Sequence, residues 1–116
     1  KLEKKISNEQ LKKKKKIKLF IQVNIGDEEQ KSGINKDQLE NFYNYCINLN
    51  LDIVGLMCIP PVSEDPEKYF KETNFLKQKF NLSELSMGMS SDYLKAVENS
   101  STYLRIGSSI FGNRSY

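Results

Sequence analysis

The sequence predicts an α/β fold in which parallel strands alternate with helices. Four short segments are nearly continuous apolar runs, the pattern of strands that are covered on both faces. The intervals between them carry apolar residues three and four positions apart, as amphipathic helices do. Such alternation implies a parallel sheet with right-handed crossover connections.

The first strand is expected at 17–25 and the first helix of the domain at about 36–49. A polar loop over 27–32 ends at Gly33. Asn35 and a glutamine three residues later have the spacing of a capping box, which predicts that the helix begins there.

The second strand is expected at 51–59, where two consecutive prolines end it. Asp65-Pro66 then has the form of a helix start, with a capping residue followed by proline at the first helical position. The apolar side of this second helix is expected to comprise Tyr69, Phe70, Thr73, Leu76 and Phe80.

A third strand is expected at 84–89, and Ser90-Ser91-Asp92 is expected to open a third helix. The fourth strand is predicted at 102–107, and a short helical segment from Ser108 onward.

Charge divides the chain into two parts. The chain of 116 residues has a net charge of +3, but residues 1–18 carry +7 and the remainder −4. We therefore expect residues 1–16 to be a Lys-rich polar segment, either a helix or a linker or insertion, and residues 17–116 to form the domain. A nucleic-acid-binding domain would carry basic residues within its fold, so no nucleic-acid partner is expected.

No apolar run approaches the ~18 residues that a membrane span needs, and the basic leader lacks the apolar core of a signal peptide. We expect no membrane contact and a cytoplasmic location, with an organellar interior left open. Cys46 and Cys58 fall at apolar positions, which predicts core thiols in a reducing compartment. Without histidine, the commonest zinc ligand sets and His-activated nucleophiles are missing, so no metal site and no catalytic residue are expected.

Two architectures fit the alternation. An open doubly wound sheet would favour a glycine-rich loop after the first strand, whereas the loop here is Gly26-Asp27-Glu28-Glu29. A (β/α) barrel needs eight strands, so this chain would supply only part of one.

The ends of the last two strands carry small residues that suit a phosphate. Gly88 permits a tight turn, and backbone N–H groups at Ser90 and Ser91 would be unpaired at a helix start, which favours an anion. The alternative is an ordinary serine cap without a ligand. In a barrel, the loops after the last two strands form the usual phosphate site.

Arg105 and Gly107 share one face of the fourth strand, and Leu104 and Ile106 share the other. Because the apolar pair should face the helices, Arg105 is expected to face the interior, and Gly107-Ser108 offers a second phosphate cradle. The alternative for Arg105 is a pairing with a neighbouring carboxylate. Met57, near the end of the second strand, either fills the core or lines a ligand wall.

These segments together resemble one family, the pyridoxal phosphate homeostasis proteins of the proline synthetase co-transcribed, or YggS, type. The resemblance rests on Val23-Asn24 with Glu28, Lys31 and Gly33, on Gly55-Leu56-Met57-x-Ile59-Pro60, on Leu85-Ser86-Met87-Gly88-Met89-Ser90-x-Asp92, and on Arg105-Ile106-Gly107-x-x-Ile110-Phe111-Gly112-x-Arg114. It implies a (β/α)₈ barrel like the N-terminal domain of alanine racemase, of which this chain is the C-terminal half, about strands five to eight.

The resemblance also implies a cofactor, pyridoxal 5′-phosphate, held as a Schiff base with a lysine. That lysine belongs to the N-terminal half, so this chain lacks it. Ser86, Ser90, Gly107 and Ser108 are implied as cofactor-binding residues, and Arg105 would approach the pyridine nitrogen. A cation there weakens the cofactor as an electron sink, so the implied role is non-catalytic vitamin B6 homeostasis.

Two other functions stay open at this point. One is a pyridoxal-phosphate-dependent racemase-like enzyme, although alanine racemases use a tyrosine from a second domain that nothing here matches. The other is a cofactor-free half-barrel scaffold. In each case a half barrel leaves strand edges unpaired, which predicts pairing with the missing N-terminal half or with a second copy.

Overall fold

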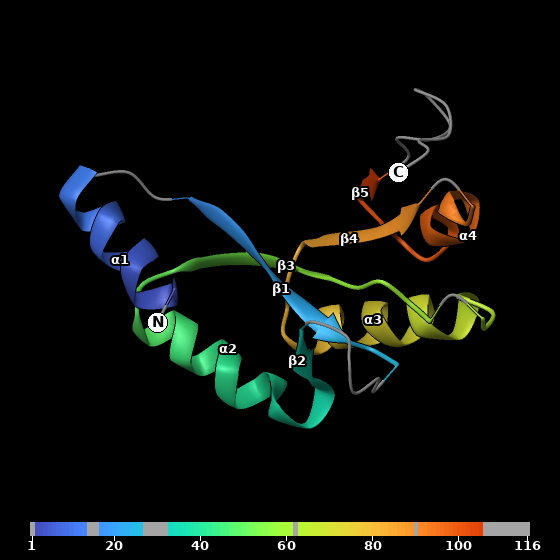
Figure 1. Ribbon diagram of the computed structural model, residues 1–116, viewed down its shortest axis with the longest axis horizontal. Helices are drawn as coiled ribbons and strands as arrows, with labels where there is room; N and C mark the ends of the chain where they lie inside the picture. Colours follow the sequence, from blue (N-terminus) through green and yellow to red (C-terminus); the bar gives the residue numbers. More distant parts are fainter. Residues whose placement is uncertain (1, 14–16, 27–32, 62, 90, 106–116) are drawn as a thin grey trace.

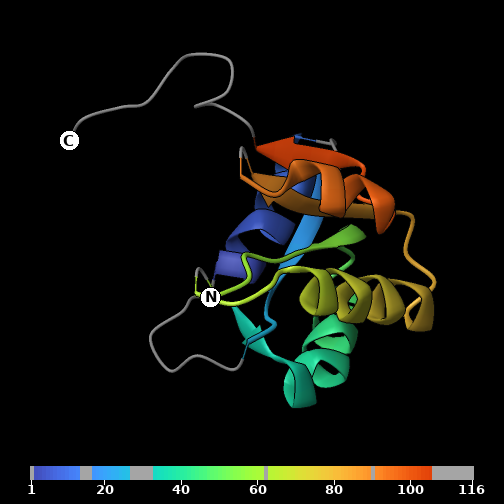
Figure 2. The ribbon, with the colours of Figure 1, turned by 90° about the vertical axis from the view of Figure 1, so that its right-hand side faces the viewer.

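The structure is a parallel sheet with helices packed along one face (Figures 1 and 2). This computed structural model describes residues 2–13, 17–26, 33–61, 63–89 and 91–105. The strand order is β2-β1-β3-β4-β5, and every neighbouring pair is parallel. The α/β class is therefore confirmed. The strands are β1 (Lys18–Asn24), β2 (Ile34–Asn35), β3 (Asp52–Met57), β4 (Glu84–Met89) and β5 (Tyr103–Arg105).

Helices α2 (Leu39–Asn48), α3 (Glu67–Lys79) and α4 (Tyr93–Glu98) lie along the same face of the sheet (Figure 2). The core lies between this helical layer and alternate strand residues, which explains the apolar runs of the sequence. Its most buried strand members are Val23, Leu56, Leu85 and Met87, joined by Ile25 just after β1, and its most buried helix members are Leu39, Cys46, Phe70, Thr73 and Ala96. None of the helices in the described ranges is long and apolar enough to cross a membrane.

The opposite face of the sheet is concave. The rings of Phe20 in β1 and Tyr103 in β5 meet edge to face, with centroids 5.2 Å apart. Strands β3 and β4 lie between their two strands, so a flat sheet would keep these rings far apart. Gly55 in β3 allows the contact, because a Cβ there would lie 2.8 Å from Cε2 of Phe20. This curvature is the kind that closes a parallel sheet into a barrel.

Strand β4 has the predicted bounds, and β1 and β3 are each slightly shorter than predicted. Asn35 takes the predicted capping position, but the capping box itself is not formed. Asn35 is extended and pairs with Asn24 as part of the edge strand β2, and its side chain makes no capping bond. A 3₁₀ turn over Lys36–Gln38 follows, so α2 begins only at Leu39.

The cap expected at Asp65 is present. Its Oδ1 accepts the backbone N–H of Glu67 at 3.1 Å. Helix α3 begins at Glu67, and Pro66 takes the capping position rather than the first helical one, one residue later than predicted.

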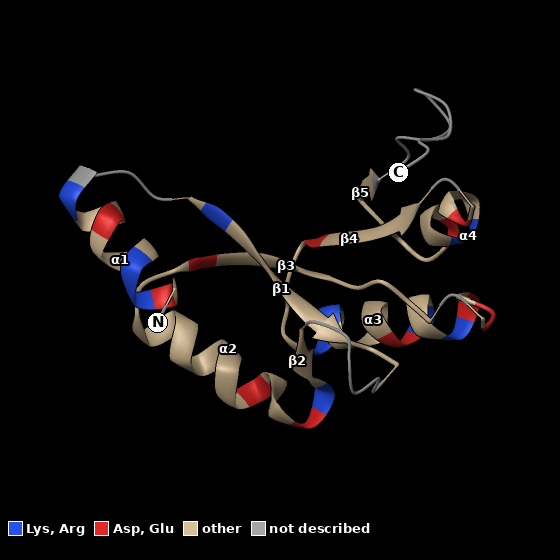
Figure 3. Cartoon of the chain, viewed as in Figure 1, with Lys and Arg blue, Asp and Glu red and all other residues tan. Residues whose placement is uncertain are grey.

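The described part of residues 1–16 is helical, one of the two forms that the sequence predicts for this segment. Leu2–Lys13 form helix α1, which lies against the end of α2 (Figure 1). Ser7 Oγ donates to the carbonyl of Leu49 at 2.6 Å, and Gln10 Nε2 donates to the carbonyl of Asn50 at 3.4 Å. These bonds satisfy carbonyls that the end of α2 leaves unpaired, which is why a polar helix can pack there. Lysines recur along α1 (Figure 3), and Lys4, Lys5 and Lys12 are exposed.

Candidate functional site

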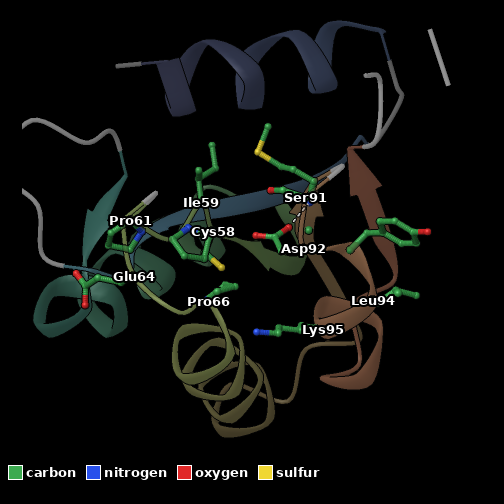
Figure 4. Close-up of a pocket in the computed structure, with 13 residues that line it drawn as sticks. Cys58, Ile59, Pro61, Glu64, Pro66, Ser91, Asp92, Leu94 and Lys95 are labelled. Atoms are coloured by element: carbon green, nitrogen blue, oxygen red, sulfur yellow. Dashed lines mark hydrogen bonds between the residues drawn. The ribbon is translucent and has the colours of Figure 1, made fainter. Parts of the chain in front are cut away.

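A pocket opens where β3 and β4 end and where α3 and α4 begin (Figure 4). Its volume is about 520 Å³, within the range of small-molecule sites. Its walls come from Cys58–Pro61, from Gly88 and Met89, and from the start of α4. The carboxyl end of a parallel sheet is where barrels and open α/β sheets place their ligands.

A buried cysteine, Cys58, lines this pocket. Cys58 is fully buried, and its Sγ accepts a hydrogen bond from Thr73 Oγ1 at 3.3 Å and lies 4.0 Å from Sδ of Met87. Cys46 is also buried, and burial raises the pKa of its thiol. Both cysteines are free, which confirms the prediction of core thiols.

The turn between β4 and α4 is held by its own backbone and by Asp92. Gly88 has a φ of +104°, and a Cβ there would lie 2.6 Å from the Cβ of Ala96. Asp92 Oδ1 accepts the N–H of Met89 at 2.7 Å, and the N–H of Asp92 donates to the carbonyl of Met89 at 3.1 Å. The expectation of unpaired N–H groups at Ser90 and Ser91 stays a prediction, and Ser90 lies outside the described residues.

Two carboxylates, each with a lysine partner, lie at the rim on the α3 side. Tyr69 donates its hydroxyl proton to Glu64 at 2.7 Å and Lys68 lies 3.3 Å away, so the pKa of Glu64 is lowered. The N–H of Glu67, and then Lys95 at 3.1 Å, lower the pKa of Asp65. Both carboxylates are therefore ionised at neutral pH, and each is paired with a lysine, so the Lys95 ammonium group at the rim already has an acid as its partner.

Of the predicted cofactor-binding residues, Ser86 is the one whose side chain the structure describes. It is half-buried in β4 and in register with Met57 on one side and Tyr103 on the other. Its neighbours Leu85 and Met87 are fully buried among the helices, so Ser86 belongs to the concave face.

The other predicted residues are only partly covered. Arg105 lies in β5 in register with Met89, but its side chain is outside the described part of the chain. Ser90, Gly107 and Ser108 lie outside the described residues altogether. The two phosphate cradles therefore stay predictions.

Sequence reasoning missed Gln22. It is half-buried in β1 and in register with Met57, on the same face as Phe20. The alternation of residues within 17–25 could have revealed it. Ile21, Val23 and Ile25 are buried against the helices, so Gln22, which lies between two of them, belongs to the opposite face of the sheet.

Comparison with known proteins places the chain in a family. The sequence model of the alanine racemase N-terminal domain matches residues 1–115, which include α1. The pyridoxal phosphate homeostasis protein of Aquifex aeolicus (strain VF5) is 39% identical over 108 residues, covering 84% of this chain and 47% of that protein. The human protein of the same name is 38% identical over 116 residues, covering 86% of this chain and 42% of the relative.

Solved structures agree with the sequence matches. PipY of Synechococcus elongatus without PLP superposes with a TM-score of 0.82 at 29% identity, covering 96% of this chain and 57% of PipY. PipY with PLP bound gives a TM-score of 0.74 at 28% identity, covering 94% of this chain and 54% of PipY. The chain spans about half the length of the curated relatives it matches. Its sheet is part of a (β/α) barrel, and the chain belongs to the alanine racemase N-terminal domain family.

Proposed function

We propose that this chain forms the phosphate-side part of a pyridoxal 5′-phosphate site and that its protein serves vitamin B6 homeostasis without catalysing a reaction. The relatives are named for pyridoxal phosphate homeostasis, and PipY has been solved with PLP bound. The observation that carries the proposal is the position of Ser86 and the β4–α4 turn. The turn lies at the carboxyl end of the curved sheet, where a barrel binds phosphate, and Ser86 faces the concave side in the row beneath it.

The residues of this end suit the cofactor in two ways. Ser86 supplies a hydroxyl on the concave face, and Met57 and Met89 supply apolar surface for a flat ring. On the α3 side, Lys68 and Lys95 are already paired with Glu64 and Asp65, so the phosphate is assigned to the concave side of the β4–α4 turn.

By the family resemblance, Ser90, Gly107 and Ser108 hold the phosphate and Arg105 approaches the ring nitrogen. When bound, pyridoxal phosphate supplies a reactive aldehyde and an electron-withdrawing ring. An arginine beside that nitrogen disfavours its protonation, which suits storage of the aldehyde better than carbanion chemistry. The Schiff-base lysine is assigned to a segment that this chain does not contain.

The same geometry supports a partner for the concave face. Tyr103 is 53% exposed and Met89 is 44% exposed there, although both belong to strands. The edge strands β2 and β5 each have one neighbour among the described strands. We assign the cover to the remaining half of the barrel, with a second copy of the chain as the alternative. The two free, buried thiols suit a reducing compartment such as the cytoplasm.

An absorbance titration with pyridoxal 5′-phosphate tests the proposal. It compares the 116-residue chain with the longest natural polypeptide that contains it. Borohydride reduction followed by peptide mapping then locates any modified lysine. We expect the longer polypeptide to bind covalently at a lysine outside residues 1–116, and the short chain to bind weakly and reversibly.

Two results would contradict the proposal. Covalent attachment at a single lysine of this chain, with the affinity of the longer polypeptide, would show that the division of the site is wrong. No spectral change with either polypeptide would mean that the fold has been kept without the cofactor.

A further inference from the structure

The concave face of the sheet is layered along the strands. At the lower level, the ring of Phe20 lies over Gly55 and meets the ring of Tyr103 edge to face, which makes an apolar floor. One step closer to the strand carboxyl ends, the register brings Gln22, Met57, Ser86 and Tyr103 into one row across β1, β3, β4 and β5. The first three residues of this row are half-buried, and Tyr103 is exposed.

The polarity of this row needs an explanation. The helix-facing residues beside it, Val23, Leu56 and Leu85, are apolar and almost wholly buried. A row made only to fill a barrel interior would use bulky apolar side chains. This row instead carries an amide and a hydroxyl on either side of a thioether, and these side chains can hydrogen-bond a polar ligand at the barrel mouth.

The row lies directly beneath the strand ends that carry the proposed phosphate site. Parallel strands are about 4.8 Å apart, so β1 lies roughly 10 Å from β4 across the sheet. A phosphate held near the β4–α4 turn therefore leaves the attached ring to extend over β3 toward β1. Met57 is the middle residue of this path, and Gln22 is its far end.

We propose that Gln22 and Met57 form the ring-contacting wall of the site, with Met57 against the flat face of the ring and the Gln22 amide bonded to a polar ring substituent. The inference rests on the proposed cofactor function and extends it to two residues that set specificity for the ring. A glutamine amide can both donate and accept a hydrogen bond, so it can bind a ring hydroxyl in either protonation state. A thioether makes favourable contacts with aromatic rings.

Ligands that share only part of the cofactor can test the assignment. Dissociation constants are measured for pyridoxal 5′-phosphate, for pyridoxal and for inorganic phosphate, the last by competition. The protein is the longest natural polypeptide that contains this chain. The variants are Gln22→Leu and Met57→Ala, with Gln78→Leu on the exposed surface of α3 as the matched control. Thermal unfolding of each variant monitors the fold.

The expected result is selective. Gln22→Leu should weaken pyridoxal 5′-phosphate and pyridoxal by roughly three- to tenfold, the effect of one lost hydrogen bond, and leave the phosphate constant unchanged. Met57→Ala should show the same selectivity, and Gln78→Leu should change none of the three constants. If Met57→Ala reduces the folded fraction, Met57→Leu keeps the volume and removes only the sulfur contact.

Three other results would overturn the inference. Unchanged cofactor affinity in both variants would remove Gln22 and Met57 from the site and leave the proposed function standing. An equal loss for inorganic phosphate would assign the two residues a purely structural role. Failure of the unsubstituted protein to bind any of the three ligands would overturn the proposed function together with this inference.

Discussion

The carboxylate of Asp92 accepts the backbone N–H of Met89 at 2.7 Å, so the residue that begins α4 also fixes the end of β4. The bond closes the turn that contains the proposed phosphate-binding serine. This single hydrogen bond joins the end of the strand to the start of the helix, and so it fixes the shape of the turn at the edge of the proposed site.

Replacing Asp92 with alanine should loosen this turn. The change removes a charged acceptor from a backbone N–H, and we expect a loss of about 1–2 kcal/mol in the free energy of unfolding. Urea denaturation measures the loss. Asp92→Asn keeps an acceptor oxygen and should recover most of the stability. Equal loss in both variants would mean that the negative charge, and not the hydrogen bond, is what matters.

Gly88→Ala should be more damaging. The backbone φ of +104° strains any residue with a side chain, and the new Cβ would meet Ala96 at 2.6 Å. We expect a loss of about 2–4 kcal/mol, measured by urea denaturation. The double variant with Ala96→Gly removes the collision but keeps the backbone strain. The loss of unfolding free energy in the double variant should therefore be smaller than the sum of the losses in the two single variants.

Ser7→Ala tests whether α1 is held to the domain. The substitution removes the hydrogen bond to the Leu49 carbonyl, and we expect a loss of about 1 kcal/mol. The readout is limited proteolysis of α1 together with urea denaturation. Asn8→Ala, at an exposed position of the same helix, is the control. Identical behaviour of the two variants would indicate that α1 is docked by other contacts.

The Tyr69–Glu64 hydrogen bond should give a pH-dependent stability. Because the bond lowers the pKa of Glu64 in the folded state, its contribution is complete above the unfolded pKa of about 4.3 and disappears as the pH falls through the folded value. The same bond raises the pKa of Tyr69, so the contribution also disappears as the pH rises above about 10.

Tyr69→Phe is the test of this pH dependence, because it keeps the ring and removes the hydroxyl. The unfolding free energies of Tyr69→Phe and of the unsubstituted chain should differ at pH 7 and converge in strong acid. A difference that stays constant from pH 7 to strong acid would show that the effect comes from packing of the ring rather than from the carboxylate.

Local pattern was enough for much of this fold. The alternation of apolar runs and helical periodicity predicted the α/β class, and the bounds of β4 followed from Glu84–Met89 alone. The need for glycine at position 88 was also visible, because a tight turn at a strand end requires positive φ. Gln22 could have been found in the same way from the buried alternation of β1.

Other features depend on partners far away in the chain. The edge strand β2 exists because Ile34 pairs with Val23, and no property of two isolated residues predicts that pairing. Helix α1 is held by carbonyls at Leu49 and Asn50, which only the end of α2 leaves available.

The sequence by itself therefore determined where the four longer strands and the helices between them lie, the charge division of the chain, and its family, because periodicity, composition and motifs are local. Only the tertiary structure decided how the sheet curves, since the Phe20–Tyr103 contact depends on two strands between them and on the missing side chain of Gly55. It also decided that Asp92 binds back to Met89 and that Gln22, Met57 and Ser86 form one row. These relationships arise from register and packing, which are fixed only when distant segments meet.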